Sequence, residues 1–151
     1  SLNPEIWTLD KNKNYVLRKE VRDKLLLIAN AFLDFIDIDN LDCDVDTKQC
    51  DIADITITGS ICNYNWSKFS DIDLHLLIDY ESIDENVDLV KNILNTKKNL
   101  WNASHDIEVK GYEVEVYAQD IDEVHHSTGV YSVLYNEWIV EPSKTKIELK
   151  T

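Results

Sequence analysis

The most constraining feature of this sequence is a pair of apolar segments joined by a polar loop, over residues 57–78. Ile72 and Leu74 alternate with Asp71 and Asp73, and the side chains of a β-strand point alternately to its two faces. The alternation predicts a strand with one apolar face and one acidic face. Two neighbouring carboxylates repel each other unless a cation lies between them, and Mg²⁺ prefers such hard oxygen ligands. We therefore expect this strand to bind a divalent metal.

The composition is typical of one folded domain, which we assign to residues 1–151. Hydrophobic residues make up 44% of the 151 residues, with only three Gly and two Pro, so the chain can bury a core. No apolar run of about 18 residues is present, and no signal segment opens the chain, so we expect a cytoplasmic protein away from membranes. The three cysteines lack a CxxC spacing and are expected to be reduced thiols.

The charge of the chain bears on its partners. Fifteen Lys and Arg face 29 Asp and Glu, which gives a net charge of −14. Phosphate contacts dominate nucleic-acid binding and usually require a basic surface, so a long nucleic acid is disfavoured as a partner. The same charge also fits a surface that only keeps the protein soluble.

Periodicity predicts the other elements of an α+β domain. We expect an irregular N-terminal arm that docks its aromatic side chains on the body, then a core and C-terminal strands, with boundaries at residues 1–16, about 18–120 and 121–151. Helical spacing predicts helices over about 18–36 and from 87 to about 98, the second opened by a capping box at Ser82–Glu85 and followed by a connector over 100–105. Alternation predicts strands over 52–58, 106–109, 112–119, 129–134 and 137–140, with a turn at Lys110–Gly111.

An acidic stretch over residues 34–54 can be interpreted either as a calcium-binding loop or as a solvated loop. Asp42, Asp44 and Asp46 alternate there, as they would in a calcium-binding loop. Thr47 and Ala53, however, stand where such a loop requires Gly and a bidentate Glu. We therefore favour a solvated acidic loop.

The loop and strand together resemble the DNA polymerase β-like nucleotidyltransferase superfamily. The matching text is Gly59-Ser60, ten residues, and then Asp71-Ile-Asp73, with apolar strands on both sides. The likeness covers roughly residues 20–120. A closer likeness, to small predicted nucleotidyltransferases of bacteriophages, extends to the segments Asn63-Tyr64-Asn65, Lys98–Asn102, Val114–Tyr117 and Gly129–Ser132. It implies a host cytoplasm as the location if a phage encodes the chain.

The resemblance implies a fold and a chemistry. The fold would be a twisted mixed β-sheet of about five strands with helices on one face. Asp71, Asp73 and a third carboxylate from a later strand would hold two Mg²⁺ ions, or Mn²⁺ in their place, that promote attack on a nucleoside triphosphate such as ATP. Glu115 is the expected third ligand and Glu113 the alternative. Three further residues would bind the triphosphate: Gly59, Ser60 and Ser70.

The sequence also departs from the superfamily pattern. Asn63 and Tyr64 stand where many relatives have Arg and Gly, and the third acid is usually Asp rather than Glu. We expect His75 to pack against a neighbour rather than contact substrate, and we attribute Lys98 to the cationic end of its helix.

The expected reaction moves a nucleoside monophosphate from a triphosphate to a hydroxyl acceptor and releases pyrophosphate. The acidic composition favours a small molecule or a protein over a long nucleic acid as the acceptor. Two alternatives stay open: a non-catalytic nucleotide- or protein-binding module of the same fold, and an antitoxin-like enzyme that nucleotidylates a partner protein. The oligomeric state cannot be predicted from these residues.

Overall fold

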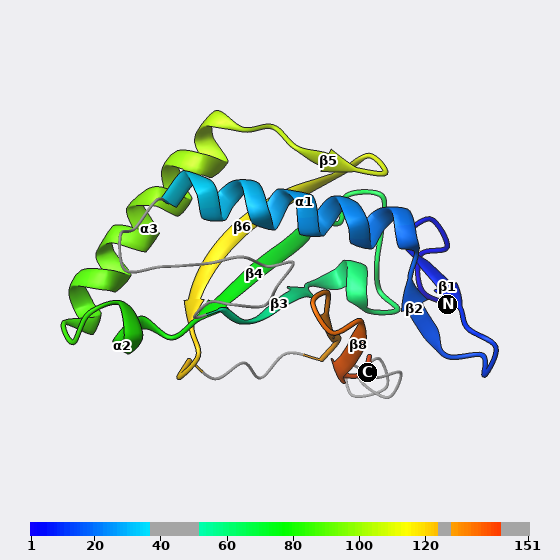
Figure 1. Cartoon of the computed structure of the whole chain (residues 1–151). Coiled ribbons are helices and arrows are strands. Elements are labelled where there is room, and N and C mark those ends of the chain that lie inside the picture. The colour runs from blue at the N-terminus through cyan, green and yellow to red at the C-terminus, as the bar shows by residue number, and fades with distance from the viewer. Residues whose placement is uncertain (37–51, 124–127, 143–151) are drawn as a thin grey trace, which may run out of the picture.

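The computed structural model describes residues 1–36, 52–123 and 128–142, and it is an α+β structure, as predicted (Figure 1). Its elements follow one another as β1 (Trp7–Leu9), β2 (Tyr15–Leu17), α1 (Lys19–Ile36), β3 (Ile52–Thr58), a 3₁₀ turn η1 (Ser60–Cys62), β4 (Ile72–Ile78), α2 (Tyr80–Ile83), α3 (Val87–Ser104), β5 (Glu108–Val109), β6 (Tyr112–Asp120), β7 (Val130–Ser132) and β8 (Glu137–Val140).

The main sheet is mixed and has six strands in the order β5-β6-β4-β3-β7-β8, one more than the predicted number of about five. Strands β4 and β6 run parallel, whereas every other neighbouring pair is antiparallel. The hairpin between β5 and β6 turns at Lys110 and Gly111, which have φ angles of 55° and 84°. Two consecutive positive φ angles are typical of a tight hairpin turn, so the predicted turn is confirmed.

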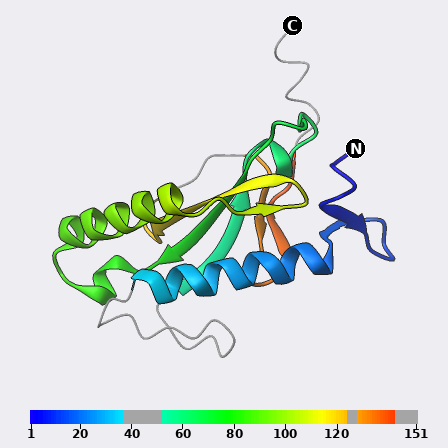
Figure 2. The same ribbon diagram turned by 90° about the horizontal axis from the view of Figure 1, so that it is seen from above.

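The long helices α1 and α3 lie on one side of this sheet (Figure 1), and Figure 2 shows β3 and β4 in the space between them. On β4 the side chains of Ile72, Leu74 and Leu76 are fully buried on the covered face. The alternate residues of the strand, which point to the opposite face, are only half-buried. The period of two predicted for this strand is therefore confirmed.

The N-terminal segment differs from the irregular arm that we predicted. β1 and β2 form a two-stranded antiparallel hairpin with Trp7 paired to Leu17. Each strand has only three residues, which is too short for a clear alternation to show in the sequence. The predicted docking of aromatic residues is confirmed at Trp7, which is buried and stacks on Trp138 with ring centroids 4.7 Å apart.

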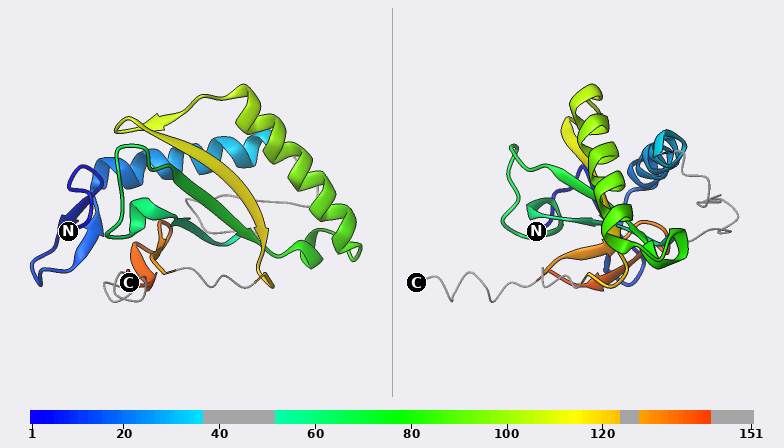
Figure 3. Two further views of the ribbon diagram at one scale, coloured as in Figure 1. Left: turned by 180° about the vertical axis from the view of Figure 1, so that it is seen from behind. Right: turned by 90° about the vertical axis from the view of Figure 1, so that its left-hand side faces the viewer.

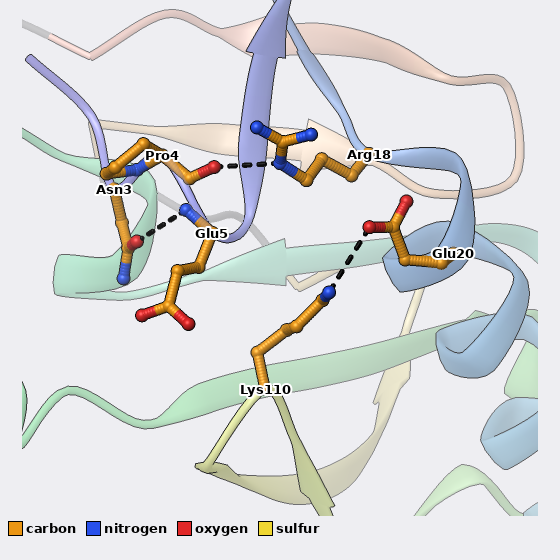
Figure 4. A network of polar contacts seen from close by, with 6 residues as sticks. All are labelled: Asn3, Pro4, Glu5, Arg18, Glu20 and Lys110. Atoms are coloured by element: carbon orange, nitrogen blue, oxygen red, sulfur yellow. Dashed lines mark hydrogen bonds and ion pairs between the residues drawn. The ribbon is translucent and has the colours of Figure 1, made fainter.

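Polar contacts fasten this segment to the start of α1 and to the β5–β6 hairpin. Figure 4 shows Arg18 Nε donating to the carbonyl oxygen of Pro4 (2.7 Å) and Lys110 Nζ lying 3.2 Å from Glu20 Oε2. Asn3 Nδ2 also donates to the hydroxyl of Tyr112 at the start of β6 (2.8 Å). The N-terminal segment is thereby tied to the end of β6 that carries Glu115.

The second helix begins at Val87 as predicted, but its predicted cap and its predicted end were wrong. Asn86, not Ser82, is its N-cap, since the Asn86 side chain accepts a hydrogen bond from the Leu89 amide. The helix then continues through the predicted connector to Ser104. Trp101 explains the extension, because its buried ring packs edge-on against Phe32 of α1, with centroids 5.6 Å apart.

Two predictions fall outside the described residues: the acidic loop around Asp42–Asp46 with its calcium interpretation, and the environment of Cys43 and Cys50. Cys62 is described and is a buried free thiol, whose pKa is raised by burial and then by the charge of Asp73. No helix within the described ranges combines the length and the apolar character needed to cross a membrane.

Candidate active site

The candidate site lies on the uncovered face of the sheet, where β3, β4 and β6 are neighbours. In the β4–β6 register Asp73 lies directly opposite Glu115, and in the β3–β4 register Asp73 lies opposite Thr58. Both carboxylates are half-buried. Parallel pairing thus places two carboxylates that are far apart in the sequence side by side on one surface.

Gly59 leads the chain out of β3 and against the carboxylate of Asp73. Its φ angle is 100°, and a Cβ at this position would lie 3.2 Å from Asp73 Oδ2. A side chain here would both strain the backbone and press on the acid. The glycine is therefore required by its close approach to Asp73, whereas its predicted approach to the phosphates stays a prediction.

The turn after Gly59 is closed by serine hydroxyls. The Oγ atoms of Ser60 and Ser70 lie 2.6 Å apart, and Ser70 Oγ also accepts from the Ser67 amide (2.9 Å). Ser70 is buried, whereas Ser60 is half-buried. Ser70 consequently positions the turn into Asp71, and Ser60 is the more accessible of the two hydroxyls.

Asn63, at the end of this turn, and Trp7, on β1, both support it. Asn63 Nδ2 donates to the Gly59 carbonyl oxygen (2.9 Å) and to that of Thr128 (3.1 Å). The Trp7 indole donates to the carbonyl oxygen of Ile61 (2.9 Å). Asn63 was noticed in the sequence only as a departure from the family pattern, since nothing local shows that it also bonds the distant Thr128.

The acidic side chains influence one another electrostatically. The pKa of Asp73 is raised, first by burial and then by the negative charges of Glu115 and Asp71. The pKa of the exposed Glu113 is also raised, chiefly by Asp106. The negative charges of Glu115 and Asp71 therefore lie close enough to disfavour the ionised form of Asp73, and a cation bound there would relieve this repulsion.

The carboxylates of Asp71, Asp73 and Glu115 have the chemistry of a divalent-metal site, although they do not converge on one point. Within residues 1–36, 52–123 and 128–142, no three His, Cys, Asp or Glu side chains are arranged so that they could hold an ion as they stand. Glu115 Oε2 accepts a hydrogen bond from the Tyr117 hydroxyl (2.7 Å). Asp71, Asp73 and Glu115 supply the oxygen ligands that Mg²⁺ and Mn²⁺ prefer.

An aromatic pair lies beside the acids. The rings of His75 and Tyr117 are stacked, with centroids 5.1 Å apart, and His75 Nε2 is hydrogen-bonded to Thr58 Oγ1 (3.0 Å). The predicted packing of His75 against neighbours is therefore confirmed. The hydroxyl of Tyr117 has a raised pKa, because of burial and then its bond to Glu115, so it stays a donor at neutral pH.

Lys98 was misjudged from the sequence. The helix continues for six residues beyond it to Ser104, so Lys98 does not cap a helix end. Its Nζ lies 5.3 Å from the centroid of the Tyr117 ring, beside the acids. Only the position of α3 against β6 reveals this contact, and no sequence signal would have distinguished Lys98 from Lys97.

Comparisons with known proteins add no family to this description. No family model matches the chain, and none of the curated proteins or solved structures compared with it gives a match.

Proposed function

We propose that this protein is a metal-dependent nucleotidyltransferase of the DNA polymerase β-like superfamily, with a minimal version of that fold. One observation carries the proposal: the β4–β6 register sets Asp73 beside Glu115, while the backbone of Gly59 lies against the Asp73 carboxylate. Carboxylates on adjacent strands could hold metal ions, and the neighbouring glycine turn leaves room for the phosphates of a metal-bound triphosphate. The resemblance of the Gly59–Asp73 segment to that superfamily supports the same conclusion.

Asp71 and Asp73 would hold two Mg²⁺ ions, or Mn²⁺ in their place, with Glu115 completing the site and Glu113 as the alternative. Bound there, the ions supply Lewis-acid stabilisation of the attacking and leaving oxygens. The chain itself would then orient both reactants, so that the attacking oxygen lines up with the bond to be broken.

The residues of the site have separate tasks in this reaction. The Ser60 hydroxyl and the amides that follow Gly59 would bind the outer phosphates of the donor, such as ATP. Glu115 would accept the proton of the acceptor hydroxyl as the new bond to the α-phosphorus forms. The bond from that phosphorus to the bridging oxygen breaks, and pyrophosphate leaves with the electron pair.

The acidic surface favours a small molecule or a protein as the acceptor. With a net charge of −14, the chain would repel a long nucleic acid unless its contact were confined to a local basic groove. The proposal places the enzyme in the cytoplasm, where nucleoside triphosphates and Mg²⁺ are both present.

One observation favours a second candidate, a module of this fold that binds nucleotide or a protein without turnover. The hydrogen bond from Tyr117 occupies an oxygen of Glu115 that the metal site would need. A nucleotidylating antitoxin is a variant of the first candidate with a protein as the acceptor. We rank both below the enzyme, because Asp71, Asp73 and Glu115 are all present.

Pyrophosphate release tests the proposal directly. The protein would be incubated with each labelled nucleoside triphosphate and Mg²⁺ or Mn²⁺, with and without candidate small-molecule and protein acceptors. We expect metal-dependent release that Asp73→Asn abolishes, since the amide removes the charge that binds the ion. Circular dichroism of Asp73→Asn would show an unchanged fold.

Glu137→Gln is the matched control, because it removes one carboxylate from an exposed position on β8, away from the site. Full turnover by Asp73→Asn would overturn the mechanism. Metal-dependent nucleotide binding without turnover under any condition would favour the non-catalytic module.

A further inference from the structure

We propose that Lys98 binds the α-phosphate of the nucleotide from the Glu115 side of the site. The inference rests on the proposed nucleotidyltransferase function and deepens it. It assigns a substrate contact to a residue that the sequence pattern had attributed to a helix end.

Helix α3 is held firmly against the strand that carries Glu115. Asn102 Nδ2 donates to the Val116 carbonyl oxygen (2.9 Å), and the Val116 amide donates to Asn102 Oδ1 (3.0 Å). This pair of bonds occupies both backbone groups of Val116, and α3 runs beside β6 as Figure 3 shows. Lys98 lies one helical turn before Asn102, so its side chain starts from a fixed position next to the site.

The side chain of Lys98 turns toward the acidic face. Its Nζ lies over the ring of Tyr117, 5.3 Å from the centroid, and the hydroxyl of that ring donates to Glu115 Oε2. Lys97, the preceding residue, instead lies over the ring of Phe35 on α1 (5.6 Å). The two neighbouring lysines therefore lie on different surfaces, and of the two only Lys98 faces the carboxylates.

Several lysines of the described residues form no ion pair, and Lys98 is the one that lies over the ring of Tyr117, beside the acids. It forms no ion pair with any carboxylate there, and a lysine that is half-buried over an aromatic ring retains its donors. Other basic side chains bond elsewhere: Lys19 to Asp23, Lys110 to Glu20, Lys24 to the Glu108 carbonyl oxygen, and Arg22 to those of Val133 and Leu134.

The two flanks of Asp73 decide which phosphate Lys98 can reach. Gly59 lies against one flank, and the turn at Ser60 would hold the outer phosphates. Glu115 lies on the other flank, through the β4–β6 register. The α-phosphate must lie over the acids between these flanks, because it is the group transferred. Lys98 approaches from the Glu115 side and would reach the α-phosphate but not the pyrophosphate.

Equilibrium binding with a series of adenosine nucleotides tests this assignment. Affinities of the full chain for AMP, ADP and ATP would be measured in the presence of Mg²⁺. An α-phosphate contact is common to all three, so we expect Lys98→Gln to weaken each by the same factor of about 10. Lys98→Arg is expected to restore most of the affinity, because it keeps the charge.

Lys97→Gln is the matched control, with the same loss of charge one residue away, and it should leave all three affinities unchanged. Ser60→Ala should weaken ADP and ATP but not AMP. A loss confined to ATP in Lys98→Gln would overturn the α-phosphate assignment, and affinities equal to those of Lys97→Gln would overturn any phosphate contact. If the wild-type protein bound no nucleotide with Mg²⁺, the proposed function itself would fail.

Discussion

The two faces of strands β4 and β6 differ sharply although they share one backbone. On the covered face Leu74 and Val116 are fully buried under the helices. On the other face Asp73 and Glu115, each one residue away, are half-buried, and burial and then the charge of Glu115 raise the pKa of Asp73. The alternation of side chains along these strands therefore puts the residues that stabilise the fold on one face and those assigned to chemistry on the other. Substitutions on the first face should lower stability, and substitutions on the second should affect function.

The largest expected effect on stability is that of Leu74→Ala. Removing this buried side chain leaves a cavity and should lower the free energy of unfolding by about 2–5 kcal/mol. Asp73→Asn, at the adjacent residue, should leave stability unchanged or raise it, because it removes a charge that its neighbours disfavour. Urea unfolding measures both variants. A loss of stability in Asp73→Asn as large as that in Leu74→Ala would contradict the separation of the two faces.

Gly59→Ala should lower both the stability of the protein and its Mg²⁺-dependent affinity for ATP. Because φ is 100° at this position, a side chain should lower the free energy of unfolding by about 1–2 kcal/mol. The added Cβ would also press on Asp73 Oδ2. Gly111→Ala is the matched control, because its φ is 84° and a Cβ there would have nothing within 4 Å. We expect similar losses of thermal stability in the two variants, but a loss of Mg²⁺-dependent ATP affinity only in Gly59→Ala. Equal ATP affinities would show that Gly59 serves the turn alone.

The smallest expected effect concerns pH. The pKa of Asp73 is raised above its ordinary value of 3.8, so the folded state disfavours the ionised carboxylate. The metal-free protein should therefore lose stability as pH rises from below 3.8 through the raised pKa, by less than about 1 kcal/mol given solvent screening. The difference between wild type and Asp73→Asn isolates this contribution in thermal unfolding at several pH values.

Added Mg²⁺ provides the companion measurement. At neutral pH it should raise the melting temperature of the wild-type protein, because an ion that binds only the folded state stabilises it. Asp73→Asn should show a much smaller rise. An identical response in both proteins would mean that the ion binds elsewhere.

Much of the fold was predictable because local patterns specify it. Helix α1 and strand β3 were expected within about one residue of their observed bounds, and the alternation of β4 was expected as well, since each has a strong period. The hairpin at Lys110–Gly111 followed from turn chemistry. The N-terminal hairpin and the last turn of α3 were missed, because both depend on packing: Trp7 stacks on Trp138, and Trp101 packs against Phe32.

The candidate site, like the fold, has parts that the sequence predicts and parts that it does not. Asp71, Asp73 and the Gly59-Ser60 turn stand in one continuous segment, so their proximity follows from the sequence alone. Glu115 was chosen over Glu113 by resemblance. The structure places Glu115 opposite Asp73, with Glu113 exposed and paired with Glu108. The bond of Asn63 to Thr128 and the contact of Lys98 with Tyr117 could not be predicted, because each joins distant segments.

The sequence by itself determined the alternation of β4, and with it the face on which Asp71 and Asp73 would lie. It could do so because the side-chain period of a strand is a local property of the backbone. Only the tertiary structure decided that Asp73 has Glu115 on one flank and Gly59 on the other, and that Lys98 rather than Lys97 faces them. Strand register and helix docking depend on contacts between residues distant in the sequence, and no local pattern records them.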